Sequence, residues 1–252
     1  MIERDNFSPG TIIWSADVTQ KEIEDVINAE ALPRGTIIKL DRYFFEKNPK
    51  DFIHFCENAG YPVFCDAKIV EIPSKAIAIA ETYLEYEPFM LNIMAGACSN
   101  ACWVNATEEN LDCLKQFADL CHRAGTRSCV VTVLTSKSPR LVDQEFGVTP
   151  LAQVIKYARM AHHAGITDIV CSPAEVAEIL KYYDEFWLNT PGVRLPDSER
   201  DDQQRIMTPK KALEAGAKRL VIGRPLTGRP EDGKIVERVK RNYERILENI
   251  FS

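Results

Sequence analysis

Residues 61–73 read YPVFCDAKIVEIP, an apolar run that ends in charged residues and leads into a helix-like segment. A short, apolar, non-alternating run such as 61–64 is typical of a parallel strand covered by helices. Two carboxylates, Asp66 and Glu71, lie on either side of Lys68. Because a strand places alternate residues on one face, we expect Asp66 and Lys68 to project the same way. A pair of this kind is most often a surface ion pair, so its role depends on the rest of the chain.

The same order, an apolar run and then a helical segment, repeats along the chain. The strand-like runs cover residues 11–16, 36–40, 61–64, 89–93, 128–134, 168–171, 186–189 and 219–222. Helical periodicity is clear at 21–27, 111–121 and 151–162. Helix starts are expected at Thr19, Ser172-Pro173 and Thr208-Pro209, and helix ends at Gly60, Gly125, Gly165 and Gly216. Eight such units predict a single (β/α)8 barrel (TIM barrel), with an open, doubly wound sheet as the alternative.

Length and composition are those of an ordinary soluble globular chain, with 252 residues, 45% hydrophobic and 27% charged. No long linker divides the sequence, so we expect one domain over residues 1–252, with an excursion at 136–149. The net charge of −6 favours neither nucleic acid nor an anionic membrane as a partner. No window has the roughly 18 apolar residues of a membrane span. The N-terminus lacks the pattern of a signal peptide, and we expect a cytoplasmic protein.

Eight cysteines are scattered along the chain, and most have apolar neighbours, as reduced core cysteines do. Cys98 and Cys102 have a C-x3-C spacing, but no second cysteine or histidine pair follows at zinc-site distance. His162 and His163 are adjacent in a helical segment, where neighbouring side chains diverge. We therefore expect no metal site.

Polar residues occur repeatedly at or just after the expected strand ends. They are Asp17, Lys39, Asp66, Lys68, Asn92, Thr135 and Arg224. In a (β/α)8 barrel the C-terminal ends of all strands meet at one mouth, so these side chains are expected to line a common site. After the last strand, Gly223 lets backbone N–H groups approach an anion, and Arg224 can hold phosphate oxygens. The polar run 197–204, after the strand at 186–189, is interpreted as a lid.

Several motifs in this order resemble those of the orotidine 5′-monophosphate decarboxylase family. Asp17, Lys39, Asp66 and Lys68 match its Asp, Lys and D-x-K positions, with spacings of 22, 27 and 2 residues. Its other elements are similar to residues 134–136 (LTS), 189–194 (NTPGVR), 202–209 (DQQRIMTP) and 221–225 (VIGRP). The resemblance extends from about residue 11 to residue 227, nearly the whole chain.

The resemblance implies decarboxylation of orotidine 5′-monophosphate (OMP) to uridine 5′-monophosphate (UMP), with no metal or organic cofactor. Lys68 is implied to protonate C6 of the pyrimidine and to stabilise the vinyl carbanion. Asp66 is implied to lie beside the substrate carboxylate, and Lys39 to anchor the charged groups. Asp17 is implied to accept a ribose hydroxyl, and Thr135 to read the pyrimidine edge.

The remaining implied contacts concern the phosphate, the base and a second subunit. Gln203 and Arg224 are implied to hold the phosphate, whose binding energy closes the lid. The other implied substrate-binding residues are Asn92, Pro191, Gly192 and Gly223. The family pattern also implies a homodimer with shared active sites, in which Glu71 supplies a catalytic carboxylate to the partner's site. The nucleotide is then the ligand, with no nucleic acid or membrane partner.

Three positions depart from the family pattern. Glu71 stands where the motif has aspartate, Lys75 where it has threonine, and Met94 where histidine is common. A glutamate carboxylate lies about 1.5 Å farther out, and misplacement by about 1 Å can lower a rate roughly 10²-fold. Two alternatives therefore stay open: an enzyme of the same superfamily acting on another nucleotide or sugar phosphate, and a non-catalytic nucleotide-binding paralogue. Lys39 argues against the sugar-phosphate branch, which commonly uses Mg²⁺, because lysine does not bind Mg²⁺ at neutral pH.

Overall fold

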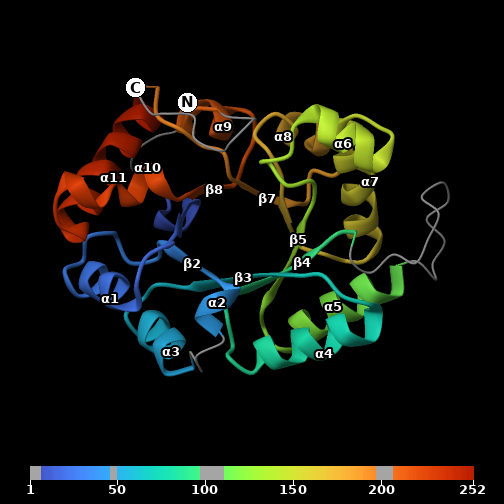
Figure 1. The fold of residues 1–252 in the computed structure, drawn as a ribbon, viewed down its shortest axis with the longest axis horizontal. Helices are drawn as coiled ribbons and strands as arrows, with labels where there is room; N and C mark the ends of the chain where they lie inside the picture. Colours follow the sequence, from blue (N-terminus) through green and yellow to red (C-terminus); the bar gives the residue numbers. More distant parts are fainter. Residues whose placement is uncertain (1–6, 46–49, 97–110, 197–206) are drawn as a thin grey trace.

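A computed structural model describes residues 7–45, 50–96, 111–196 and 207–252, and the strands in these ranges close into one barrel (Figure 1). Each strand pairs in parallel with the next, and the pairing of Ile12 with Leu220 joins the first strand to the last. The strands are β1 (Ile12–Ser15), β2 (Ile37–Asp41), β3 (Val63–Ile69), β4 (Met90–Met94), β5 (Arg127–Val131), β6 (Asp168–Val170), β7 (Trp187–Thr190) and β8 (Arg219–Ile222). The predicted (β/α)8 barrel is confirmed, and the closed sheet excludes the open-sheet alternative.

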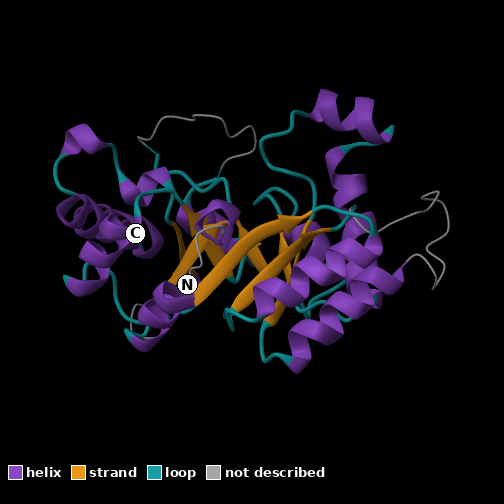
Figure 2. Cartoon of the chain, turned by 60° about the horizontal axis from the view of Figure 1, so that its bottom comes forward, coloured by secondary structure: helices purple, strands orange, loops and turns teal. Residues whose placement is uncertain are grey.

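Helices surround the strands on the outside of the barrel (Figure 2). They are α1 (Gln20–Asn28), α2 (Arg42–Phe45), α3 (Lys50–Asn58), α4 (Pro73–Leu84), α5 (Asp112–Arg123), α6 (Pro139–Phe146), α7 (Pro150–His163), α8 (Val176–Leu180), α9 (Pro209–Glu214), α10 (Arg224–Thr227) and α11 (Ile235–Phe251). Some connections hold two helices, so the alternation is looser than one helix per strand. The excursion predicted at 136–149 contains α6.

Local sequence signals begin and end several helices as expected. Thr19 caps α1, because its side chain accepts a hydrogen bond from the backbone N–H of Glu22, which bonds back to Thr19. Thr208 caps α9 by accepting a hydrogen bond from the backbone N–H of Lys211, and Pro209 occupies the first turn. Gly216 follows α9 with a φ of 106°, a conformation that favours glycine, and a Cβ there would force Leu180 Cδ1, 2.4 Å away, to move.

The helix start expected at Ser172-Pro173 is wrong, because α8 begins at Val176. The backbone N–H of Ser172 donates to the Glu175 carboxylate at 2.8 Å, and its hydroxyl accepts from the backbone N–H of Ala174 at 3.3 Å. Serine side chains form such local turns as readily as helix caps. A turn therefore separates β6 from its helix.

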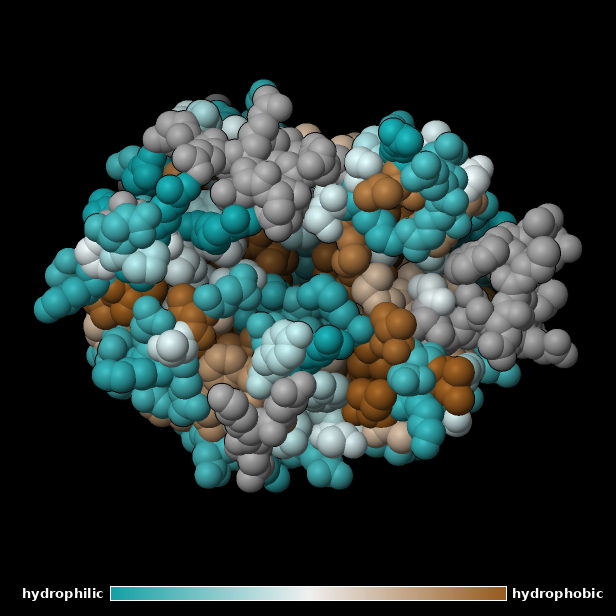
Figure 3. All heavy atoms as spheres, viewed as in Figure 1, coloured by the Kyte–Doolittle hydropathy of each residue, from teal (hydrophilic) through white to brown (hydrophobic). Residues whose placement is uncertain are grey.

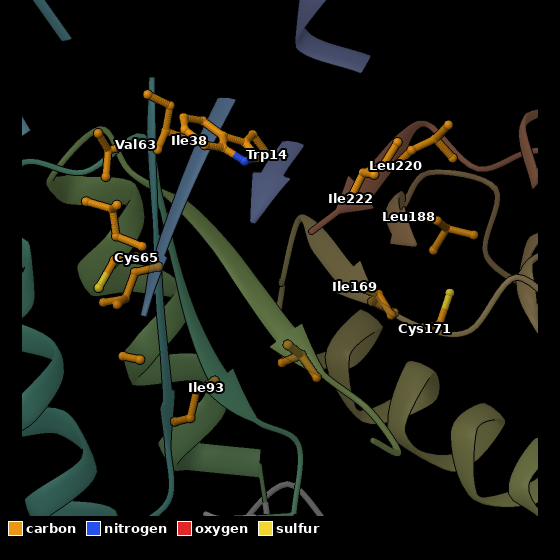
Figure 4. Close-up of a cluster of buried hydrophobic side chains, with 14 of the residues drawn as sticks. Trp14, Ile38, Val63, Cys65, Ile93, Ile169, Cys171, Leu188, Leu220 and Ile222 are labelled. Carbon is orange, nitrogen blue, oxygen red and sulfur yellow. The ribbon is translucent and has the colours of Figure 1, made fainter. Parts of the chain in front are cut away.

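The core has two layers, one on each side of the barrel wall. Inside the barrel lie Ile13, Ile37, Phe64, Met90, Cys129 and Val221. Between the strands and the helices lie Trp14, Ile38, Cys65, Ile93, Leu188, Leu220 and other apolar side chains (Figure 4). Adjacent residues such as Ile13 and Trp14 therefore face opposite layers, and both are buried. Burial on both sides explains why the strands are apolar without alternation.

Strand β3 differs most from its predicted form. It continues to Ile69, so Asp66 and Lys68 lie within the strand and not after it. Its register against β4 shifts between Cys65 and Ile69, which pair with Leu91 and Ile93, so β3 contains a bulge. Lys68 lies in this bulge with a φ of 44°. The regular alternation used to orient Asp66 and Lys68 is therefore interrupted where these residues occur.

The two ends of the chain meet where the barrel closes. The indole N–H of Trp14 on β1 donates to the Thr227 hydroxyl at 3.0 Å. The rings of Phe7 and Phe251 make an edge contact, with centroids 5.5 Å apart. Within the described ranges, no helix is both long enough and apolar enough to cross a bilayer.

Candidate active site

A cavity of about 290 Å³ opens where the strands end. The surface is hollowed near the middle of the face shown in Figure 3, and hydrophobic residues are visible in the hollow. Its charged lining residues come from five different strands or the loops after them: Asp17, Lys39, Asp66, Lys68, Arg194 and Arg224. Its apolar wall includes Phe64, Val131, Val133, Val170 and Val221. A partly apolar cavity with converging charges is the usual form of a small-molecule site.

Asp66 joins two lysines in this cavity. Its Oδ2 accepts a hydrogen bond from Lys39 Nζ at 2.6 Å and from Lys68 Nζ at 2.6 Å. The side chains of Lys39 and Asp66 are buried, with 11% and 6% exposed, whereas that of Lys68 is 44% exposed. The prediction that Asp66 and Lys68 project together is confirmed, although the bulge and not simple alternation brings them together.

The ion pairs set the charge states of the buried members. Burial alone raises the pKa of Asp66, but the charges and hydrogen bonds of Lys39 and Lys68 outweigh it and hold this pKa well below its ordinary value. Burial likewise lowers the pKa of Lys39, and Asp66 outweighs it, so the pKa of Lys39 is raised overall. Asp66 is therefore a carboxylate and Lys39 an ammonium at neutral pH.

Asn92 lies behind the three charged residues. Its Nδ2 donates to Asp66 Oδ1 at 2.6 Å, and its Oδ1 accepts from the backbone N–H of Lys68 at 2.6 Å. The side chain is fully buried and is not among the residues that line the cavity. The contact with substrate implied for Asn92 by the family resemblance is therefore a contact with Asp66 and Lys68 in this structure.

Two arginines line the cavity from the segments that follow β7 and β8. Arg224 follows β8 beside Gly223, as the sequence predicts. Arg194 also lines the cavity but was not expected at the site; it is 7% exposed, and its Nη1 donates to the Val193 carbonyl at 2.9 Å. The signal was present in the sequence, because Arg194 ends the NTPGVR element at 189–194.

The other expected site residues are partly brought together. Asp17, Thr135, Pro191 and Gly192 line the cavity. Glu71 does not; it is exposed, and its carboxylate accepts from the backbone N–H of Ile72 at 3.0 Å.

Some expectations fall outside the described residues: Gln203, the lid at 197–204, and Cys98 with Cys102. In the ranges that the structure does describe, no group of three or more histidine, cysteine or acidic side chains could hold a metal ion.

Fold and cavity together define a (β/α)8 barrel with an enzyme-type site at the C-terminal ends of its strands. A carboxylate shared by two lysines and two guanidinium groups line this site. Comparison with known sequences narrows this class. Residues 10–239 match the Orotidine 5'-phosphate decarboxylase / HUMPS family, and the chain belongs to this family.

Individual relatives are similar in sequence to most of this chain. It is 32% identical to the orotidine 5'-phosphate decarboxylase of Dictyoglomus turgidum, over 94% of this chain and 97% of that protein. It is 33% identical to the protein of the same name from Syntrophomonas wolfei, over 86% of this chain and 90% of that protein. The crystal structure of orotidine 5'-phosphate decarboxylase from Lactobacillus acidophilus superposes with a TM-score of 0.72 at 25% identity, covering 96% of this chain and 99% of that one.

Proposed function

We propose that this protein decarboxylates OMP to UMP. The observation that carries the proposal is the sharing of one oxygen of Asp66 by Lys39 and Lys68, each at 2.6 Å, at the wall of the cavity. Decarboxylation leaves an electron pair on carbon, and a fixed ammonium group both stabilises that pair and protonates it. Membership of the family supports OMP as the substrate.

Lys68 has the position and exposure that the chemical step requires. With the pyrimidine C6 beside Lys68 Nζ, the substrate carboxylate lies near Asp66, and the two negative charges repel each other. The bond between C6 and the carboxylate breaks, CO2 leaves, and the electron pair stays on C6. Lys68 then transfers a proton to C6 to give UMP and regains a proton from solvent. Lys39 keeps Asp66 charged and in place throughout.

The two arginines provide a binding site for the phosphate group, apart from the lysines that contact Asp66. Arg224 and Arg194 can each hold phosphate oxygens in bidentate geometry. The family resemblance implies a further phosphate contact from Gln203, which lies outside the described residues. Asp17 is exposed at the rim and suits a ribose hydroxyl, while Thr135 lines the cavity and suits the pyrimidine edge. Binding energy from the phosphate then holds C6 against Lys68.

The reaction needs no metal or organic cofactor in this scheme. The family description also names HUMPS. The family resemblance implies that its sugar-phosphate branch commonly uses Mg²⁺, which takes oxygen ligands, with a glutamate on the second strand. The buried side chain at that place is Lys39, already bonded to Asp66. No observation favours the sugar-phosphate alternative, and the intact Lys39, Asp66 and Lys68 argue against a non-catalytic paralogue.

The proposal includes a homodimer in which Glu71 serves the partner's site, in a single-domain chain located in the cytoplasm. Glu71 lies outside the cavity of its own chain, between Val70 and Ile72. These two large apolar side chains are 63% and 61% exposed, and Tyr43, after β2, is 62% exposed. Exposed apolar groups beside an active site are typical of a surface that a second subunit covers.

The test of the proposed activity is the loss of orotidylate ultraviolet absorbance when purified protein is added. The wild-type protein should convert OMP, and Lys68→Ala should not. Lys21→Ala is the matched control, because this lysine on α1 is 81% exposed and bonds only to Asp25 in the described structure. Tight binding of UMP by wild-type protein without any turnover of OMP would instead support the non-catalytic paralogue.

Subunit sharing has its own test. Mixing Lys68→Ala with Glu71→Ala should restore about a quarter of wild-type activity, because half of the dimers are mixed and each mixed dimer has one intact site. No recovery on mixing would refute the role of Glu71 across the interface.

A further inference from the structure

We infer that Asn92 is a positioning residue, whose amide holds both the Lys68 backbone and the Asp66 carboxylate in their working geometry. The inference deepens the proposed function and rests on it. It differs from a substrate contact, which the family resemblance implies, because the Asn92 side chain is fully buried and outside the cavity lining.

The bulge in β3 gives the reason for this arrangement. Between the pairs Cys65–Leu91 and Ile69–Ile93, β3 contains two more residues than β4, so the regular ladder of backbone hydrogen bonds is interrupted. Asn92 is the β4 residue between Leu91 and Ile93. Its Oδ1 accepts from the Lys68 backbone N–H at 2.6 Å and so replaces the missing backbone partner. One side chain thus satisfies a donor that the bulge would otherwise leave unpaired.

The same amide orients the carboxylate. Its Nδ2 donates to Asp66 Oδ1 at 2.6 Å, which leaves Oδ2 for Lys39 and Lys68. Lys68 also has a φ of 44°, a conformation that non-glycine residues rarely adopt and that the surroundings must hold. Both the direction of the Lys68 side chain and its ion pair therefore depend on Asn92.

Kinetics of Asn92→Ala separate positioning from substrate binding. We expect kcat to fall about 10²-fold, because the ammonium group moves relative to C6. KM should stay within about threefold, because Asn92 contributes no surface to the cavity. A large rise of KM at unchanged kcat would overturn the inference and return Asn92 to the substrate.

Asn92→Asp gives a pH signature that a purely structural role would not give. The new carboxyl faces Asp66, with Lys68 and Lys39 beyond it and Cys129 on the neighbouring β5 strand. Burial keeps the pKa of Cys129 well above its ordinary value, so this thiol stays neutral. Two adjacent carboxyls raise the pKa of the pair. When one of the two carboxyls is protonated, it can donate a hydrogen bond to the other, as the Asn92 amide does to Asp66 in the wild type. The kcat of Asn92→Asp relative to wild type should therefore rise as pH falls. A pH-independent ratio would contradict the inference.

Asn189→Asp is the matched control. Asn189 is also fully buried, and its Nδ2 donates to the carboxylate of Asp168 at 3.1 Å, at the opposite end of the barrel. The same chemical change there should leave the pH dependence of kcat as in the wild type. A similar pH dependence in both variants would show that the effect does not come from the position of Asn92.

Hydrogen exchange of the Lys68 backbone amide tests the same inference without using activity. In protein labelled with ¹⁵N-lysine, exchange of this amide should be at least about tenfold faster in Asn92→Ala than in wild type and unchanged in Asn189→Asp. Unchanged protection in Asn92→Ala would refute the inference. If wild-type protein fails to convert OMP, the proposed function fails, whereas the exchange result still decides whether Asn92 holds the bulge.

Discussion

Asp66 at the mouth of the barrel and Asp168 at its opposite end are both buried carboxylates that receive two cationic side chains and one asparagine amide. At the mouth the cations are lysines, and both bond to the same oxygen of Asp66. At the opposite end they are Arg127 and Arg219, which bond to different oxygens of Asp168 at 2.8 and 2.7 Å. The two clusters are thus alike in charge and different in chemistry.

We call Asp168 with Arg127 and Arg219 the lower cluster, and Asp66 with Lys39 and Lys68 the upper cluster. The residues of the lower cluster do not line the cavity, and aromatic rings pack against its guanidinium groups. Trp187 lies against both guanidinium groups, with the Cζ atoms of Arg219 and Arg127 at 4.3 and 5.0 Å from its ring centroid. The Arg219 side chain is only 6% exposed. Arginine remains charged at any ordinary pH and gives up no proton. This cluster therefore stabilises the barrel without taking part in proton transfer.

The comparison shows what makes a buried charge cluster reactive. Lysine holds a compact charge and a proton that it can transfer, and the side chain of Lys68 is 44% exposed, beside the cavity. The geometry around Asp66 leaves one ammonium group available to a ligand, whereas that around Asp168 uses both cations within the protein. Four experiments examine this difference, in order of decreasing effect.

Exchanging the type of cation should give the largest effect. Lys68→Arg keeps the charge but removes the transferable proton, so kcat for OMP should fall by at least about 10³-fold. Arg127→Lys at the other end should leave kcat within about twofold and lower the Tm. Steady-state kinetics and thermal unfolding measure both variants. Comparable losses of kcat would show that the two clusters do not differ in role.

Removing the lower carboxylate should give the largest loss of stability. Asp168→Ala leaves two buried or partly buried guanidinium groups without their partner, which should lower the free energy of unfolding by about 3–5 kcal/mol. Urea unfolding measures the change. The fraction that remains folded should keep its KM for OMP; a large change of KM would indicate that this end of the barrel is coupled to the cavity.

The loss of stability in acid should report the protonation of Asp66 at the mouth of the barrel. The pKa of Asp66 is lower in the folded than in the unfolded protein, so its stabilisation is complete above about pH 4. Below that pH the unfolded chain takes up the proton first, and stability should decline by up to about 1.4 kcal/mol per pH unit. Asp66→Asn should lack this part of the slope in urea unfolding between pH 5 and 3.

Changing the aromatic cover of the lower cluster should give the smallest effect. Trp187 is 42% exposed, so Trp187→Leu removes mainly its contact with the two guanidinium groups. The expected loss of stability is about 1 kcal/mol, with kcat unchanged. Thermal unfolding and the absorbance assay measure these quantities. A loss of activity larger than the loss of stability would contradict the separation of the two ends.

The sequence predicted features that arise from local patterns. Strands that are buried on both faces have apolar sequences, and helix starts have capping residues such as Thr19 and Thr208. The barrel and the order of its elements could therefore be predicted from the sequence. The convergence of Lys39, Asp66 and Lys68 followed from the barrel, because strand ends share one mouth.

Features that depend on register were not accessible from the sequence. The bulge in β3 contains no glycine, and nothing in the residue types near Lys68 marks its positive φ. The partners of Asp168 lie 41 and 51 residues away, on strands whose pairing only the closed sheet sets. Arg194 belongs to the NTPGVR element at 189–194, but whether its side chain points into the cavity depends on the path of the chain after β7.

Closure of the barrel by β1 and β8 has a consequence for biosynthesis. Strand β1 leaves the ribosome long before β8, the strand that pairs with its other edge. This edge of β1 therefore stays open until about residue 222 has emerged. Open strand edges pair readily with other chains. Asp17 and Arg224 follow the two strands of this seam, so a prematurely terminated product lacks both its closing strand and the arginine proposed to bind phosphate. Truncated translation products should therefore be inactive and prone to aggregate.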